Sequence, residues 1–276
     1  MWSDKSLGPA EAGPDRQAVI MNAVGVARRD RALVLAALAA LTALTWAYII
    51  YLGLGSSSMT MVGDMAMPMM MQWSVADFVF MLVMWAVMMF AMMLPSVTPA
   101  VMIYERVRAK REEAGRPFVP TGSFVAGYLL VWLVFSLAAT VLNWWLHTGG
   151  ALSSMMGRVA PTVGGVMLIL AGLFQWTPLK NACLEHCRSP MSFLTAHWHE
   201  GTLGAAKMGL HHGAYCLGCC WMLMVLLFVL GVMNLPWVAV LTIVVLAEKT
   251  LPFGRFLSRG LGLVLIAWGG WLITIA

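Results

Sequence analysis

The residues of this chain best suited to chemistry carry sulfur. Its 276 residues include 24 methionines and five cysteines, and 13 of the methionines lie between Met59 and Met93. Thioethers and thiolates are soft ligands, which suit Cu(I) and zinc better than magnesium or calcium. The composition therefore directs the search for a site towards soft transition metals.

The most specific pattern is a group of three cysteines in the apolar segment 206–230. Successive residues of an α-helix are about 100° apart, so these cysteines and a histidine one turn earlier fall within an arc of about 100°. The four residues are His212, Cys216, Cys219 and Cys220. Three thiols and an imidazole on one helix face predict a soft-metal site. The alternative is a face of small residues on which helices pack closely.

A second pair, Cys183 and Cys187, lies in the polar stretch before that segment, which we expect to be a loop. The i, i+4 spacing would place both thiols on one side of a helical turn. Because one helix cannot enclose a metal alone, this pair or the second apolar segment must complete the coordination. The alternative is a solvated loop whose thiols stay reduced in the cytoplasm.

A methionine-rich stretch, Met59–Met71, follows the first apolar segment. The alternating positions Met65, Met67 and Met69 would let one loop wrap several sulfur atoms around one ion. Thioethers also remain ligands outside the cytoplasm, where thiols oxidise. We therefore predict that this loop captures copper. The alternative is an interfacial loop that uses methionine as an adaptable apolar filler.

Further methionines continue into the apolar segment 75–96. Met88 and Met92, with Met81 and Met84 before them, fall within an arc of about 80° on a helix. This stripe of thioethers predicts a path for a soft ion into the bilayer. The alternative is ordinary packing, because methionine fills apolar cores well.

The overall composition places the chain in a lipid bilayer. Hydrophobic residues make up 61% of the chain and charged residues 11%, whereas a soluble domain carries about 25% charged residues. Such a chain cannot cover itself with a surface that water tolerates. The net charge of +5 comes from basic residues placed as membrane orientation requires, which argues against a nucleic-acid partner.

Seven apolar segments approach the length of about 20 residues that a spanning helix needs. We therefore predict an all-α, polytopic transmembrane bundle of about seven helices over residues 32–276, after a disordered cytoplasmic tail over residues 1–31. Pro95 and Pro99 predict a kink or an end in the second segment. The segments are 33–54, 75–96, 123–146, 159–177, 206–230, 236–251 and 258–275.

The basic residues predict the orientation of this bundle. With seven spans, 16 of the 17 lysines and arginines fall on one side, and the cytoplasmic side carries such an excess. The N-terminus is then cytoplasmic, all five cysteines lie on or near the inner side, and the methionine-rich loop lies outside. Glu248 and Lys249 end the sixth segment near the inner interface, where we expect both side chains to reach the headgroups.

Four stretches are distinctive when taken together. They read M-W-A-V-M-M-F-A-M-M-L-P-S at 84–96, K-N-A-C-L-E-H-C-R-S-P at 180–190, G-L-H-H-G-A-Y-C-L-G-C-C-W-M-L-M at 209–224, and V-M-N-L-P-W at 232–237 followed by A-E-K-T-L-P-F-G at 247–254. Over roughly residues 78–274 the chain resembles a bacterial family of predicted metal-binding integral membrane proteins, a domain of unknown function. The resemblance implies metal binding in the bacterial inner membrane and supplies no activity.

Three functions remain open at this point. The first is the binding of a soft metal, copper before zinc, in metal handling or translocation; no ATP-binding loop is recognisable, so transport would be passive or coupled to another gradient. The second is membrane thiol–disulfide oxidoreduction, because Cys216 and Cys219 have the spacing of redox motifs, although the cytoplasm is reducing. The third is a structural or assembly subunit that contacts other membrane proteins. The sequence favours a non-enzymatic role.

Overall fold

The computed structural model describes residues 31–52, 74–116, 119–148, 161–189, 191, 194, 198–231 and 234–275. The chain divides into two units, Met1–Ala37 and Leu38–Ala276. Within the described ranges every regular element is an α-helix, which confirms the all-α fold. The predicted tail over residues 1–31 lies outside the description except for Arg31, where the first apolar helix begins.

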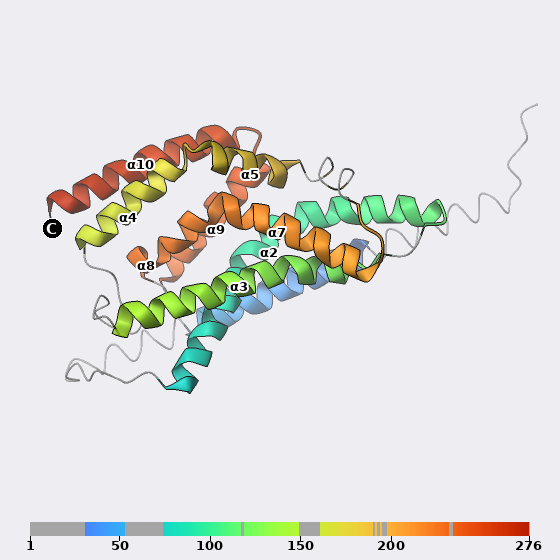
Figure 1. Ribbon diagram of the computed structural model, residues 1–276, viewed down its shortest axis with the longest axis horizontal. Helices are drawn as coiled ribbons and strands as arrows, with labels where there is room; N and C mark the ends of the chain where they lie inside the picture. Colours follow the sequence, from blue (N-terminus) through green and yellow to red (C-terminus); the bar gives the residue numbers. More distant parts are fainter. Residues whose placement is uncertain are drawn as a thin grey trace, which may run out of the picture. The chain divides into compact units, whose positions relative to one another are not determined.

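Each of the seven predicted segments coincides with a helix (Figure 1). The first is the helix Arg31–Leu52. The others are α2 (Val75–Glu113), α3 (Thr121–Thr148), α4 (Pro161–Phe174), α7 (Gly201–Val225) with the short α8 (Leu227–Leu230), α9 (Leu235–Thr250) and α10 (Gly254–Thr274).

The helix lengths refine the predicted number of spans. Among the described residues, five helices are long and apolar enough to cross a membrane: Arg31–Leu52, α2, α3, α7 with α8, and α10. A sixth span would combine α4 with the helix that follows it, across a bend of 63°. The helix α9 has 16 residues, which is shorter than the usual span of about 20.

We predicted a kink or an end at Pro95 and Pro99; the helix α2 continues through both prolines to Glu113, so it does not end there. Proline has no N–H, and Pro95 therefore leaves the carbonyl of Ala91 without its donor within the helix. The indole Nε1 of Trp46 donates to that carbonyl at 3.1 Å. A neighbouring helix thus supplies the missing hydrogen bond, as membrane helices with internal proline require.

The stretch after α4 is also a helix, α5 (Pro178–Arg188), where we expected a loop. Thr177 caps its first turn, with its Oγ1 accepting from the backbone N–H of Lys180 at 3.3 Å, and Pro178 occupies the first position. Proline is favoured there because that N–H has no partner within the helix. The cysteine pair therefore sits on a regular helix face.

Glycines let the central helices approach closely. A methyl group added at Gly209 of α7 would collide with the backbone of α3 at Phe124, and one added at Gly127 of α3 would collide with α7 at Ala206. The helices α4 and α10 lie side by side in the same way (Figure 1), with Gly165 against the backbone of α10. Small residues at helix contacts are typical of bundles in membranes.

The helix α7 is the centre of the arrangement that matters here. It packs against α3 on its glycine face and against α5 along the cysteine face, while α2 packs against both α3 and α9. Elements far apart in the sequence are therefore brought to one place: the middle of α2, the start of α3, all of α5, the middle of α7 and the end of α9.

Candidate functional site

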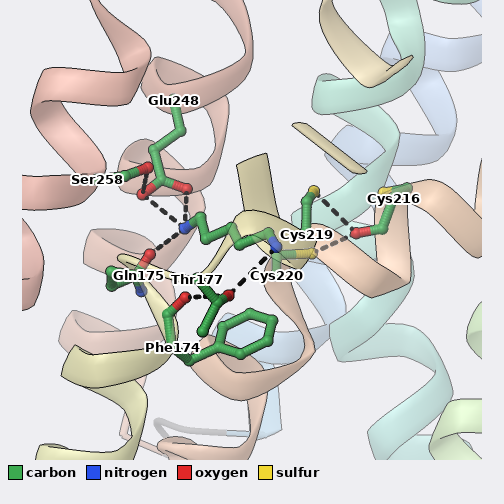
Figure 2. A network of polar contacts seen from close by, with 9 residues as sticks. Phe174, Gln175, Thr177, Cys216, Cys219, Cys220, Glu248 and Ser258 are labelled. Atoms are coloured by element: carbon green, nitrogen blue, oxygen red, sulfur yellow. Dashed lines mark hydrogen bonds and ion pairs between the residues drawn. The ribbon is translucent and has the colours of Figure 1, made fainter. Parts of the chain in front are cut away.

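The predicted cysteine face of α7 points into the bundle. Cys216, Cys219 and Cys220 are each 1% exposed. The thiols of Cys219 and Cys220 donate to the backbone oxygen of Cys216 at 3.1 and 2.9 Å, and Figure 2 shows both sulfur atoms directed at that oxygen. The helical period therefore gave the correct buried face.

The helix α5 adds its two thiols to the same place. The thiol of Cys187 lies close enough to those of Cys216 and Cys219 to interact with them. The sulfur of Cys183 lies against Gly218 of α7, so closely that a methyl group there would stand 2.8 Å from it. All five cysteines are free thiols, and together they form one cluster from two helices, which we call the thiol cluster.

Two further contacts hold α5 against α7 and α9. The ring of His186 stacks on that of Tyr215 with centroids 4.2 Å apart and planes 9° apart. At the end of α5, the guanidinium of Arg188 donates to the backbone oxygens of Leu251 and Pro252 at 2.7 and 2.8 Å. Both contacts come from the last turn of α5, which they hold against its neighbours.

A buried ion pair anchors the start of α5. The Nζ of Lys180 lies 2.8 and 2.9 Å from the two carboxylate oxygens of Glu248, and these two residues are 0% and 1% exposed. Gln175 accepts from the same ammonium, and Ser258 donates to the carboxylate at 2.8 Å. Figure 2 shows these contacts, with Gln175, Ser258 and Glu248 grouped together. The expectation that Glu248 reaches the headgroups is wrong, because its carboxylate turns inwards to a buried partner.

A second polar group surrounds the sulfur of Cys216. The ammonium Nζ of Lys249 donates to Cys216 Sγ at 2.9 Å and to Ser96 Oγ of α2 at 3.1 Å. The hydroxyl of Tyr128, from α3, lies 3.0 Å from the same sulfur. Lys249 therefore faces the thiol cluster rather than the interface. The sequence indicates the charge of Lys249 but not the direction in which its side chain points.

His212 is buried one turn before Cys216, with 4% of its surface exposed. Its ring lies 6.1 Å from that of Phe124 and 6.0 Å from that of Tyr128, measured between centroids. It shares the predicted face with the cysteines and packs among aromatic side chains at the edge of the cluster.

The methionines of α2 form a buried line that leads to the cluster. Met88 and Met92 are 1% and 0% exposed. The far end of the line is marked by Met81, whose sulfur accepts from Asn143 Nδ2 at 3.3 Å. The near end is Met92. The backbone oxygen of the next residue, Met93, accepts from the Tyr128 hydroxyl at 3.3 Å, and that hydroxyl lies 3.0 Å from Cys216 Sγ. The loop residues Met65, Met67 and Met69 lie outside the described residues.

The thiols are gathered but not yet arranged around a central point. Within the described ranges, no three His, Cys, Asp or Glu side chains are placed as direct ligands of one metal ion. The thiols of Cys219 and Cys220 are instead turned towards a backbone oxygen. Metal binding would require them to lose their protons and rotate towards the ion, since the thiolate is the ligand form. The donor set itself fits a soft ion.

Comparison with known proteins shows to which family the chain belongs. A family model described as copper chaperone, PpoB2, matches residues 82–272. The chain belongs to this copper chaperone family. The matched region covers the methionine line from Met84 onwards, both cysteine helices and Lys249. It agrees closely with the stretch over which the sequence resembles metal-binding membrane proteins. No curated protein and no solved structure matches the chain.

Proposed function

We propose that this protein handles copper by binding Cu(I) to the thiol cluster of α5 and α7. The observation that carries the proposal is the approach of the two cysteine helices: the sulfur of Cys183, on α5, lies against Gly218, on α7, and Cys187 interacts with the α7 thiols. Thiols from two helices can surround an ion that one helix cannot enclose, and thiolate ligands favour soft ions, Cu(I) among them. Membership of the copper chaperone family supports copper as the cargo.

The bundle lies in a membrane in this proposal, with its N-terminus in the cytoplasm of a bacterial cell. Five apolar helices of sufficient length support the membrane, as do large apolar side chains that α3, α9 and α10 expose. Examples with more than half of their surface exposed are Val134, Trp145, Ile243, Val264 and Trp271. Reporter fusions at the two ends test the orientation: the proposal expects an inward N-terminus and an outward C-terminus.

The methionine line serves as the approach to the thiol cluster. Met88 and Met92 lie inside the bundle on the helix that also carries Ser96, a neighbour of Lys249. Each residue of a helix rises by about 1.5 Å, so the line from Met81 to Met92 covers about 17 Å. Thioethers are uncharged and bind Cu(I) more weakly than thiolates, so an ion would pass down the line to the cysteines. Capture by Met65, Met67 and Met69 belongs to the same proposal.

The test is the metal content of the protein purified in mild detergent and loaded with Cu(I) under anaerobic, reducing conditions. The parent is compared with a variant in which Cys216, Cys219 and Cys220 are replaced by serine, after thermal unfolding has shown that both are folded. We expect near-stoichiometric copper in the parent and its loss in the variant. Equal copper in both, or zinc in place of copper, would contradict the proposal.

The thiol contacts also favour one second candidate, thiol–disulfide oxidoreduction. Cys187 and Cys216 come from different helices and their thiols interact, so an interhelical disulfide would join two neighbouring groups. Titration of free thiols after exposure to a quinone, without metal, distinguishes the two. Rapid loss of two thiols per chain that reductant reverses would favour the redox function, whereas stable thiols favour copper binding.

A further inference from the structure

The ammonium of Lys249 is directed at sulfur rather than at the carboxylate of the adjacent residue, Glu248. Its Nζ lies 2.9 Å from Cys216 Sγ and 3.1 Å from Ser96 Oγ. The neighbouring carboxylate of Glu248 is bonded instead to Lys180 and Ser258. A full positive charge therefore stands at the edge of the thiol cluster, close to where a metal bound to Cys216 would lie.

Thiolate ligands alone do not decide between copper and zinc, because both metals bind them well. A fixed positive charge does discriminate, since it repels a divalent ion twice as strongly as a monovalent one. At a separation of about 4 Å and an effective dielectric constant of about 20, one extra unit of charge weakens binding by roughly a thousandfold. Because the lysine chain can move away from an arriving ion, we expect a smaller effect, of at least about tenfold.

We propose that Lys249 is a specificity-determining residue, which makes the thiol cluster selective for a soft monovalent cation over a soft divalent one. The inference rests on the proposed function, since it concerns the same cluster. Ser96 explains how the charge stays in place: its hydroxyl accepts from the ammonium and remains a partner after a metal has taken the electron pair of the Cys216 sulfur. Tyr128, at 3.0 Å from that sulfur, closes the other side with an uncharged group.

The experiment compares dissociation constants for Cu(I) and Zn(II), each measured by competition with a chromophoric chelator on the full chain in detergent. Lys249→Gln removes the charge and keeps a hydrogen-bond donor, Lys249→Arg keeps the charge, and Lys207→Gln removes an exposed charge elsewhere on α7. We expect Lys249→Gln to raise the affinity for Zn(II) relative to Cu(I) at least tenfold. The other two variants should keep the ratio of the parent.

A measurement on the unmodified chain tests the inference without any substitution. Ag(I) and Cd(II) are soft ions that carry one and two positive charges. Thiolate-to-metal absorbance reports the binding of Cd(II). The inference expects Ag(I) to bind and Cd(II) to bind far more weakly; equal affinities would overturn it. An unchanged ratio in Lys249→Gln, with copper binding still dependent on the cysteines, would overturn the inference and leave the proposed function standing. Copper binding that does not need the cysteines would contradict both the inference and the proposed function.

Discussion

Replacing Glu248 by glutamine should destabilise the protein strongly and loosen α5. The change leaves the ammonium of Lys180 buried, with 0% of its surface exposed, and without the carboxylate that now lies 2.8 Å away. Removing one partner of a buried ion pair costs about 3–5 kcal/mol, a large part of a total stability of roughly 5–15 kcal/mol. Because Lys180 is on the first turn of α5, we expect the thiols of Cys183 and Cys187 to become accessible.

The matched control is the second ion pair of α5, between Glu185 and Arg255, whose side chains are 61% and 50% exposed. Exposed pairs contribute about 0–1 kcal/mol, so Arg255→Met should change little. The assay is thermal unfolding in detergent, followed by a dye that reacts with free thiols, on Glu248→Gln, Arg255→Met and the parent. The double variant Lys180→Met/Glu248→Leu should recover most of the loss, because an apolar replacement of both partners removes the buried charge. Equal stability of Glu248→Gln and Arg255→Met would refute this reasoning.

Three further outcomes follow from the packing. Trp46→Phe should lower the free energy of unfolding by about 1–3 kcal/mol, because it leaves the buried carbonyl of Ala91 without a donor. Equal stability of the variant and the parent in thermal unfolding would show that this hydrogen bond is unimportant. Gly209→Ala should destabilise the protein by more than about 1 kcal/mol, because the added methyl group collides with α3. Unchanged stability in the same unfolding assay would mean that α3 and α7 can move apart to make room for it. Exchange of Met88 and Met92 for leucine should leave the equilibrium copper content unchanged and slow copper loading in stopped-flow experiments; unchanged loading would remove the methionine line from the route.

The sequence predicted most of the fold because membrane helices are long and apolar. The seven segments all coincide with helices. The differences are that the helix ends are shifted and that α2 continues through Pro95. The helix α5 was missed because it is polar and short, although Thr177 followed by Pro178 is a start signal that the sequence displays. Its remaining stability comes from tertiary contacts such as the ion pair of Lys180, which no local pattern contains.

The site was predictable in part. The helical period placed Cys216, Cys219 and Cys220 on one face, which is buried. The need for further ligands pointed either to the pair Cys183 and Cys187 or to the second apolar segment. The roles of Glu248 and Lys249 were not predictable from their place at the end of an apolar segment. Adjacent residues of a helix point about 100° apart, so the two charges face different neighbours, one on α5 and the other on α7. Their burial depends on which helices pack against α9, and that is a property of the whole bundle.

The most direct test of the account is X-ray absorption at the copper edge of the Cu(I)-loaded protein, measured for the parent and for Cys187→Ser. The parent should show a copper ion surrounded by sulfur, and the variant should show fewer sulfur neighbours, because Cys187 reaches the thiols of α7 from α5. A copper ion bound by nitrogen or oxygen, or an identical sulfur shell in the variant, would contradict binding between the two helices.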